Sequence, residues 1–343
     1  MNSWEYLKGK VVLVTGAAGT IGSALCEQLT PLVKSLRCLD HSENDLFFLH
    51  QQLPRCSPFI GDVRDLDRLR FAMNGVDVVF HTAALKHVGL GEYNPFEVVQ
   101  TNLQGLNNVI RSALDANVER VVFTSSDKAV NPTNVMGASK MMGERLIAAA
   151  NEIRGTHRTR FASVRFGNVI GSRGSVVPIF ARQILRGEAL SLTDEGMTRY
   201  VMTIPEAARL VLEAGSLMRG GEVFVTKMRA LKVVDLAHAM ASRLSTRPPK
   251  IDIIGARQGE KLFEELLSID EMSRAVELER LLVVLSLNAE QYDGGTREVF
   301  ASGKSVTREW HSGKDTSMSR EEIVKYLDEE GVLAPYLEKG ALA

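Results

Sequence analysis

The strongest constraint on the fold of this 343-residue chain is a rhythm in its first half. Between residues 11 and 170, short apolar runs rich in β-branched residues alternate with stretches that carry apolar residues at helical spacing. This alternation predicts parallel strands joined by right-handed helical crossovers, and so a doubly wound α/β sheet with helices on both faces. The expected strands are KVVLVTG, LRCLD, PFIGDV, VDVVFHTAA, RVVFTSS and FASVRFGNVIG, and the expected helices are IGSALCEQL, DLDRLRFAM and FEVVQTNLQGLNNVIRSALDAN.

After Gly171 the alternation becomes irregular. Helical patterns occur at about 204–217, 231–244 and 259–268, with a short strand in EVFVT, and these pieces are too fragmentary to predict a second independent sheet. Near the end, SREEIVKYLDEEG predicts a helix, because Ser319 and Glu322 have the spacing of a capping box.

The domain organisation that follows is a nucleotide-binding domain and a smaller lobe. We place the first in residues 1–170, with return segments near 198–228. Residues 171–343 are expected to form mainly a substrate-binding lobe with a helical tail.

Composition narrows the class of partner. The 41 basic and 42 acidic side chains nearly cancel and no long run of one sign occurs, which argues against nucleic acid or an anionic membrane and favours small molecules. Cys26, Cys38 and Cys56 lack the close pairs of a metal or redox motif, so reduced thiols and no metal are expected. There is no apolar leader and no run near the ~20 apolar residues that span a bilayer, so we expect a cytoplasmic protein.

A glycine loop follows the first expected strand. In VTGAAGTIGSAL, Gly16, Gly19 and Gly22 form a G-x-x-G-x-x-G pattern that opens a helix. Glycines allow a tight turn and close approach to a pyrophosphate, while the helix N-terminus supplies free N–H groups and positive potential. Thr20 and Ile21 lie at the same turn.

The acidic residues after the next two strands bear on the choice of dinucleotide. Asp40 ends the second strand, 18 residues after Gly22, where a carboxylate suits the ribose hydroxyls of NAD and repels the 2′-phosphate of NADP. His41 could soften this preference, so NADP stays open. In GDVRD, Asp62 is placed to reach the adenine edge or to cap the next helix, and both roles can hold together.

The candidate catalytic stretch is TSSDKAVNPTNVMGASK. Asp127 and Lys128 stand at the carboxyl end of a central parallel strand, which points to the ligand crevice of such a sheet. Met136 lies four residues before Lys140, so both occupy one face of a helix. A methionine there is ordinarily core filling.

Several motifs together carry a family resemblance. SSDKAVNPTNVMGASK, ALKHV, VRFGNVIGSRGSVVPIF, GMTRY and GARQGEKLFEE resemble the nucleotide-sugar 4,6-dehydratases that act on UDP-N-acetylglucosamine, over about residues 8–270. These enzymes belong to the extended short-chain dehydrogenases, whose fold is a Rossmann-type sheet with a smaller C-terminal lobe. That superfamily carries Tyr-x-x-x-Lys, and one dehydratase branch has Met in place of the Tyr, as at Met136. The membrane anchor of the longer members is not expected in this chain.

The resemblance implies a redox-neutral cycle for surface-glycan synthesis. NAD takes hydride from sugar C4, a base removes the acidified C5 proton, the C6 hydroxyl leaves as water, and the hydride returns to C6. By position, Lys128 as a neutral amine is the C5 base and Asp127 as a protonated carboxyl is the C6 acid. Because no phenol is present, we expect the C4 proton to leave through Ser126 or Asp127, while Lys140 steadies the alkoxide and Met136 shapes the sugar pocket.

The resemblance also implies a set of binding residues. The candidate cofactor-binding residues are Gly16, Gly19, Thr20, Ile21, Gly22, Asp40, Asp62, Val63, Ala83, Ala84, Lys86, Asn102 and Lys140. The candidate substrate-binding residues are Lys86, Asn168, Ser175, Val176, Pro178, Phe180, Arg199, Arg257 and Glu260. The two arginines suit phosphates because a guanidinium offers a bidentate fork.

Other functions remain compatible with these residues. A nucleotide-sugar 4-epimerase shares the fold but needs no acid and base at C5 and C6, so Asp127 and Lys128 argue against it. A silent NAD-binding protein is suggested by the missing tyrosine, and a plain dehydrogenase would accumulate reduced cofactor. The sequence leaves open a GDP sugar instead of a UDP sugar and the C5 configuration of the product. A homo-oligomer is expected because family members commonly assemble.

Overall fold

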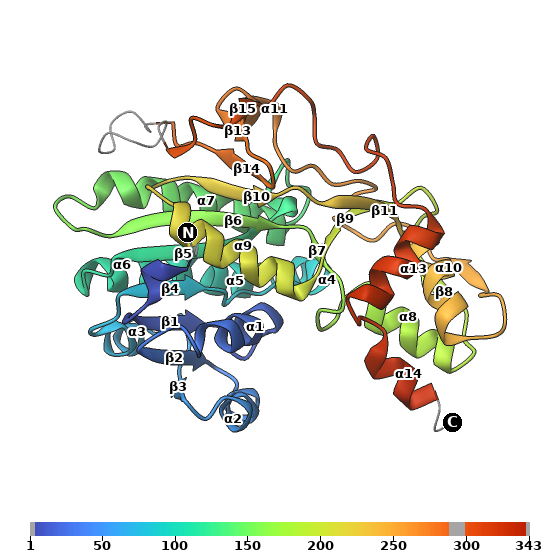
Figure 1. Cartoon of the computed structure of the whole chain (residues 1–343), viewed down its shortest axis with the longest axis horizontal. Helices are drawn as coiled ribbons and strands as arrows, with labels where there is room; N and C mark the ends of the chain where they lie inside the picture. Colours follow the sequence, from blue (N-terminus) through green and yellow to red (C-terminus); the bar gives the residue numbers. More distant parts are fainter. Residues whose placement is uncertain (1–3, 288–298, 341–343) are drawn as a thin grey trace. The chain divides into compact units, whose positions relative to one another are not determined.

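The computed structural model describes residues 4–287 and 299–340, and the chain divides into two compact units (Figure 1). Unit 1 comprises Met1–Phe166, Pro205–Lys227 and Leu267–Glu309. Unit 2 comprises Gly167–Ile204, Met228–Leu266 and Trp310–Ala343. Each unit is assembled from segments that are distant in the sequence.

Unit 1 is built on one large sheet whose strand order is β15-β13-β14-β10-β6-β5-β4-β1-β2-β3. Neighbouring strands from β10 to β3 are parallel, whereas β14, β13 and β15 pair antiparallel at the other edge. The predicted doubly wound α/β fold is confirmed. The strands are β1 Val11–Thr15, β2 Ser35–Asp40, β3 Cys56–Ile60, β4 Val78–His81, β5 Arg120–Ser126, β6 Arg160–Phe166, β10 Val223–Thr226, β13 Ala275–Glu277, β14 Leu281–Val284 and β15 Lys304–Ser305.

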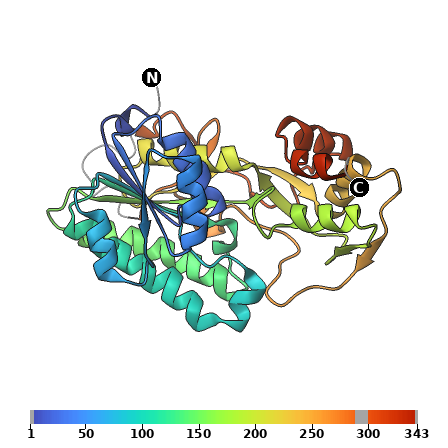
Figure 2. The same cartoon turned by 90° about the horizontal axis from the view of Figure 1, so that it is seen from below.

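Helices cover both faces of this sheet (Figure 2). On one face, buried residues of α3, α6 and α7 pack against Leu13, Val79, Val121 and Phe123 of the strands. On the other face, α9 approaches so closely that a Cβ on Gly215 would lie 3.5 Å from the Phe80 ring. The helices of unit 1 are η1 Glu5–Leu7, α1 Thr20–Leu29, α2 Glu43–Gln52, α3 Leu66–Met73, α4 Val88–Tyr93, α5 Pro95–Val98, η2 Val99–Gln104, α6 Gly105–Asp115, η3 Asp127–Ala129, α7 Val135–Ile153, α9 Ile204–Leu217 and α11 Ile269–Met272.

The helix expected in residues 96–117 is interrupted. It consists of α5, a π-helical turn η2, and α6. A π turn inserts an extra residue into the helical repeat and is frequent at functional sites. Here it includes the buried Asn102, one of the candidate site residues.

Unit 2 contains two small sheets and a helical core. The sheets have the orders β11-β9-β7 and β12-β8, so the fragments after Gly171 do form sheets, contrary to the expectation from sequence. Buried residues of α8, α10 and α13 make up its core. The elements are β7 Asn168–Val169, β8 Leu190–Leu192, β9 Thr198–Met202, β11 Arg229–Lys232, β12 Ile251–Ile253, α8 Val176–Leu185, α10 Val233–Leu244, α13 Arg320–Glu329 and α14 Ala334–Gly340.

Two sequence expectations about this part of the chain are tested by the structure. The capping box of the late helix is confirmed, with Ser319 and Glu322 bonded reciprocally at the start of α13. The helix expected at 259–268 is wrong. That segment is irregular because its backbone bonds to other segments: Leu262 O accepts from Thr198 N, and Leu266 N donates to Trp310 O.

Residues 267–309, which the sequence analysis placed in the second lobe, belong to unit 1. Their strands β13, β14 and β15 extend the large sheet, because β14 pairs with β10 in antiparallel register. Within the described ranges, no helix combines the length and apolar character needed to cross a bilayer.

Candidate active site

The candidate catalytic residues gather at the carboxyl ends of the central strands of unit 1. The register aligns Thr15 of β1 with His81 of β4, and His81 with Phe123 of β5. Because parallel strands end together at one edge, the loops after β1, β4 and β5 emerge side by side. The glycine loop, the loop through Ala83 and the turn η3 therefore share one edge of the sheet.

The glycine loop leaves no room for a side chain at Gly16 or Gly22. Gly16 has φ +66°, and a Cβ there would lie 2.6 Å from the backbone nitrogen of Ala83. A Cβ on Gly22 would lie 2.1 Å from Gly16 O. Gly19 is the N-cap residue of α1 and, being glycine, makes no side-chain hydrogen bond to the start of the helix. A loop of this kind fits the pyrophosphate of a dinucleotide.

Asp40 ties the end of β2 to this loop. Its Oδ2 accepts from Ala18 N at 3.0 Å and its Oδ1 accepts from Ser42 N at 3.0 Å, and the residue is 7% exposed. The carboxylate therefore sits at the loop in a fixed orientation. This is where the sequence placed the group that would meet an adenosine ribose.

The sequence analysis allowed Asp62 to cap the next helix, but in the structure it does not. Asp65 is the cap of α3 and accepts from Arg68 N, because it directly precedes the first helical residue. Instead, Asp62 Oδ2 accepts hydrogen bonds from Nε and Nη2 of Arg64 at 3.0 and 2.7 Å. These bonds hold the pKa of the Asp62 carboxyl below its ordinary value. The neighbouring Val63 packs in the core, with its carbonyl accepting from Asn108.

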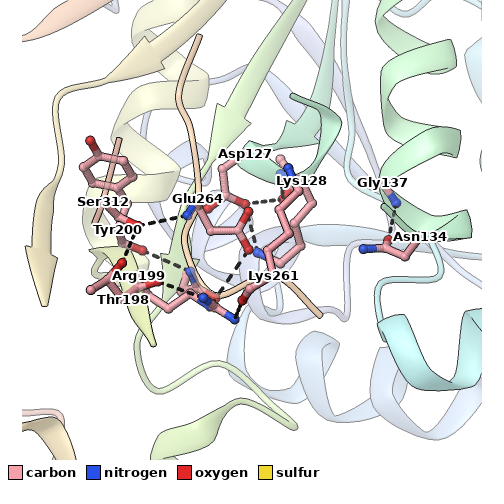
Figure 3. A network of polar contacts seen from close by, with 12 residues as sticks. Asp127, Lys128, Asn134, Gly137, Thr198, Arg199, Tyr200, Lys261, Glu264 and Ser312 are labelled. Atoms are coloured by element: carbon pink, nitrogen blue, oxygen red, sulfur yellow. Dashed lines mark hydrogen bonds and ion pairs between the residues drawn. The ribbon is translucent and has the colours of Figure 1, made fainter. Parts of the chain in front are cut away.

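The end of β5 and the turn η3 bring three candidate catalytic residues into one hydrogen-bonded series, of which Figure 3 labels Asp127 and Lys128. Ser126 Oγ donates to Asp127 Oδ1 at 2.9 Å, and Lys128 Nζ donates to the same oxygen at 2.9 Å. Asp127 is fully buried, while the side chain of Lys128 is 19% exposed. Asp127 Oδ2 is sheltered from water and has no hydrogen-bond partner among the described residues. A buried carboxyl oxygen in that state is available to a ligand hydroxyl.

Helix α7 holds this turn through a glycine. A Cβ on Gly137 would lie 2.4 Å from the carbonyl oxygen of Lys128, so only glycine allows the helix and the turn to pack this closely. Asn134 caps the helix by accepting from Gly137 N at 2.7 Å (Figure 3). The M-G-A-S-K sequence thus positions η3 as well as supplying Lys140.

Lys140 is buried on the sheet-facing side of α7. Its Nζ donates to Thr124 O at 2.7 Å and lies 4.8 Å from the centre of the Phe123 ring. Burial lowers the pKa of Lys140 from its ordinary 10.5 to about 8, although the negative charge of Glu144 raises it. The ammonium form therefore predominates at neutral pH and titrates near pH 8.

His81 is a buried residue of this edge that sequence reasoning missed. Its Nδ1 lies 2.7 Å from Thr15 Oγ1, and its ring stacks on Phe123. Burial and the nearby charge of Lys140 lower the pKa of His81 to about 3, so the imidazole is neutral at physiological pH. Its position at the end of β4, opposite Thr15, is the signal that could have identified it.

Asn102 and Met136 have structural partners at the start of α7. Asn102 accepts from Leu85 N at 2.8 Å and donates to Leu85 O and to Ser139 Oγ, so it fixes the loop after β4 to the helix. Ser139 Oγ in turn donates to Met136 O. Met136 is buried at 4% exposure, and a Cβ on Gly91 of α4 would lie 3.8 Å from Met136 Cβ. Ala84 is half-buried and Lys86 exposed on this same loop after β4.

In unit 2, the predicted substrate residues fall into two groups. Arg199 is buried at 8% exposure, with Nη1 donating to Thr198 O and Nη2 donating to Lys261 O, and its Nε lies 3.9 Å from Glu264 Oε1 (Figure 3). Asn168 donates to Tyr200 O at 3.1 Å. The second group lies elsewhere in the unit: Ser175 caps α8 without a side-chain bond, Val176 and Pro178 are half-buried on α8, Phe180 packs in the core, and exposed Arg257 bonds through its backbone to Glu260.

The model of one protein family, described as "Polysaccharide biosynthesis protein", matches residues 12–286. The match spans most of the chain, including every candidate residue above. The chain belongs to this family. Its fold is that of the extended short-chain dehydrogenases and reductases, which include nucleotide-sugar dehydratases and epimerases.

The relatives that this chain matches have several different names. An "Uncharacterized membrane protein" of Methanocaldococcus jannaschii is 47% identical, over 82% of this chain and 87% of its own. A UDP-N-acetylglucosamine 4,6-dehydratase (inverting) of Campylobacter jejuni is 40% identical, over 80% and 82%. A UDP-glucose 4-epimerase of Rickettsia canadensis is 38% identical, over 78% and 81%. The chain spans only 46% of the length of CapD of Staphylococcus aureus, a capsular polysaccharide biosynthesis protein that is 46% identical.

Solved structures agree with this assignment. The structure of Pen from Bacillus thuringiensis superposes with a TM-score of 0.88 at 38% identity, covering 94% of this chain and 98% of that one. MoeE5 in complex with UDP-glucose and NAD superposes with a TM-score of 0.62 at 26% identity, covering 73% and 86%. The family protein therefore shares its fold with enzymes that bind nucleotide sugars.

Proposed function

We propose that this family protein is a NAD-dependent nucleotide-sugar 4,6-dehydratase, with UDP-N-acetylglucosamine as its substrate. The observation that carries the proposal is the Ser126–Asp127–Lys128 series, in which a hydroxyl, a carboxyl and an amine are joined at 2.9 Å each. Removal of water across C5 and C6 needs a base and an acid next to each other. An epimerase, which only oxidises and reduces C4, has no use for that pair.

NAD is the cofactor whose binding groups this chain supplies. The glycine loop would hold the pyrophosphate, Asp40 would accept from the adenosine ribose, and the buried Lys140 would bind at the nicotinamide end. NAD supplies a hydride acceptor for C4 that later returns the hydride to C6. The carboxylate of Asp40 disfavours the 2′-phosphate of NADP.

The C4 hydroxyl proton has a route that needs no tyrosine. Ser126 Oγ accepts this proton while it passes its own to Asp127 Oδ1, along the existing 2.9 Å hydrogen bond. Asp127 then holds the proton that the departing C6 hydroxyl requires to leave as water. Met136 takes no part in this transfer, and as a buried side chain it keeps bulk water away.

Lys128 completes the proton balance. As a neutral amine it removes the C5 proton of the 4-ketone, and as an ammonium it returns a proton to C5 when the hydride arrives at C6. The proton from C4 leaves with the C6 oxygen as water, so the enzyme ends each turnover as it began. The ammonium of Lys140 stabilises the negative charge that develops on the C4 oxygen.

The nucleotide is assigned to residues of unit 2. Asn168 donates to Tyr200 O and Arg199 donates to Thr198 O, so both side chains bond to β9. Both carry N–H donors suited to a diphosphate. Arg257 and Glu260 sit on one turn, where the carboxylate can accept from a ribose hydroxyl. The segment from Ser175 to Phe180 is assigned to the base, with Lys86 of unit 1 assigned to the sugar.

The deciding experiment is incubation of the purified protein with UDP-N-acetylglucosamine in deuterated water, without added reductant, followed by mass spectrometry and proton NMR. Loss of one water with one deuterium at C5 supports the dehydratase, and the ring couplings report retention or inversion at C5. A product of unchanged mass with inverted C4 would instead assign the 4-epimerase activity that the Rickettsia relative's name suggests. Absence of any product with both UDP and GDP sugars contradicts the proposal.

A further inference from the structure

A buried series of four charges lies behind the candidate active site in unit 1. It consists of Lys140 and Glu144 on α7, Arg165 on β6 and Glu271 on α11. Their exposed fractions are 6%, 7%, 2% and 7%, so none of the charges is solvated as it would be in water. Buried charges of this kind are tolerated only where each is compensated by others.

Arg165 joins the two carboxylates. Its Nε and Nη2 donate to the two oxygens of Glu144 at 2.8 and 2.6 Å, and its Nη1 and Nη2 donate to the two oxygens of Glu271 at 2.9 and 2.6 Å. Both contacts are bidentate, the strongest geometry for a guanidinium and a carboxylate. Glu271 is held in place by a capping box with Ser268 at the start of α11.

Glu144 links this triad to Lys140. The two residues are four apart on α7 and face the same side of the helix. Burial lowers the pKa of Lys140 to about 8, and the field of Glu144 opposes that effect. Arg165 also bonds to Glu144, so its positive charge weakens the negative potential that Glu144 creates at Lys140. A second carboxylate beside Arg165 offsets that positive charge.

We propose that Glu271 and Arg165 are positioning residues that keep Lys140 charged by acting through Glu144. The proposal rests on the proposed function, in which the ammonium of Lys140 is required. Glu271 offsets the charge of Arg165 and leaves the triad with one net negative charge beside Lys140. In this way Glu271 on α11, which lies on a different segment of unit 1 from the residues assigned to the reaction, controls the charge of Lys140.

Other charged groups also face Lys140 or the triad. His81 on β4 is neutral at physiological pH, and on η3 Lys128 Nζ lies 2.9 Å from Asp127 Oδ1. Arg274, just after α11, lies 4.0 Å from Glu271. The substitutions below leave all of these groups unchanged.

The sign of the effect follows from the charge of the triad. Glu271→Gln removes one negative charge, so the pKa of Lys140 falls and the ammonium is lost at lower pH. The double variant Arg165→Met/Glu271→Gln restores one net negative charge, so the pKa of Lys140 returns to its wild-type value or above it. Ser268→Ala is the matched control, because it removes the hydroxyl that accepts from Glu271 N, keeps the backbone N–H that donates to Glu271 Oε2, and changes no charge.

The test is a pH titration of Lys140 by NMR in protein labelled with 13C at lysine Cε, with the signal assigned by Lys140→Met. Glu271→Gln is expected to lower the pKa of Lys140 by about half a unit or more, as one charge changes at moderate distance. In Ser268→Ala the pKa of Lys140 is expected to stay within about 0.2 units of the wild-type value. In the double variant it is expected to stay within the same range or to rise above it. The alkaline limb of the pH–rate profile should move by the same amounts.

The inference is overturned if Glu271→Gln leaves the pKa of Lys140 unchanged. It is also overturned if Ser268→Ala lowers this pKa by the same amount as Glu271→Gln. If Glu271→Gln does not fold, Glu144→Gln serves instead, since it removes the same charge closer to Lys140 and must lower the pKa further. The titration needs no substrate. A shifted titration in a protein that turns over no nucleotide sugar would therefore refute the proposed function and leave this electrostatic link standing.

Discussion

Two turns at the same edge of one sheet perform their tasks in opposite ways. The loop after β1 depends on positions that lack a side chain, since a Cβ on Gly22 would lie 2.1 Å from Gly16 O. The turn η3 after β5 works through side chains, since Ser126, Asp127 and Lys128 bond to one another there. In the proposed function, the first turn would offer backbone N–H groups to a diphosphate, and the second would offer side chains that transfer protons.

The comparison teaches where substitutions should act. A change in the glycine loop should abolish cofactor binding and leave nothing to catalyse. A change in η3 should leave cofactor binding intact and remove turnover. Gly137 is the exception within the second region, because it requires bare backbone against the carbonyl of Lys128.

The largest effect is expected for Gly22→Ala. The added methyl group collides with backbone, so we expect at least a hundredfold loss of NAD affinity in calorimetry, with about 1–3 kcal/mol of stability lost to overpacking. Gly89→Ala is the matched control, because a Cβ there meets nothing within 4 Å. Unchanged NAD affinity in Gly22→Ala would contradict the assignment of the loop.

Asp127→Asn should separate the two turns most clearly. Asparagine keeps the shape but cannot hand a proton to the C6 oxygen, so kcat should fall by roughly 10²–10⁴ while the NAD dissociation constant stays within about threefold. The control is Asp67→Asn, whose side chain is 93% exposed. If Asp127→Asn retained full turnover, the proton route through η3 would be wrong.

Gly137→Ala tests whether η3 also depends on bare backbone. The Cβ would lie 2.4 Å from Lys128 O, so the turn must shift, and we expect a tenfold to hundredfold fall in kcat at unchanged NAD affinity. Ala138→Gly weakens the same helix by about 1 kcal/mol without touching the turn. Equal losses of kcat in both variants would show that helix stability alone is responsible.

The smallest effect is expected for Met136→Tyr. If the C4 proton leaves through Ser126 and Asp127, a phenol at this position adds little, and kcat should stay within about threefold of the wild type in the same NMR assay. Ser126→Ala, by contrast, should lower kcat by roughly tenfold or more. A tenfold gain in Met136→Tyr would show that the missing tyrosine limits the native reaction.

Periodicity predicted the elements of unit 1 because its parallel strands are buried on both faces. Such strands appear in the sequence as short continuous apolar runs, which can be recognised locally. The same reasoning failed at 259–268, where apolar residues at helical spacing belong to an irregular segment. There Leu262 and Leu266 bond through their backbones to Thr198 and Trp310, partners that are distant in the sequence. Local propensity is overridden where backbone groups find such partners.

The candidate site divides in a similar way. Position relative to the strands predicted that Asp127 and Lys128 lie at the carboxyl end of β5, and spacing predicted that Lys140 lies on the following helix; their catalytic roles stay predictions. The capping role allowed for Asp62 was wrong, because Asp65 directly precedes the helix and caps it, while the role of Asp62 at the adenine edge stays a prediction. Glu271 was missed because its S-x-x-E spacing reveals only a helix cap, and nothing local points to Arg165.

By itself, the sequence determined the doubly wound sheet, the glycine loop and the adjacency of Ser126, Asp127 and Lys128 at the end of β5. These features depend on residues that are adjacent or at fixed spacing, so the chain's own geometry brings them together. Only the tertiary structure decided that Lys140 shares a buried charge series with Arg165 and Glu271, and that Gly137 presses α7 against η3. Such contacts join segments far apart in sequence, and packing, which no local pattern encodes, selects them.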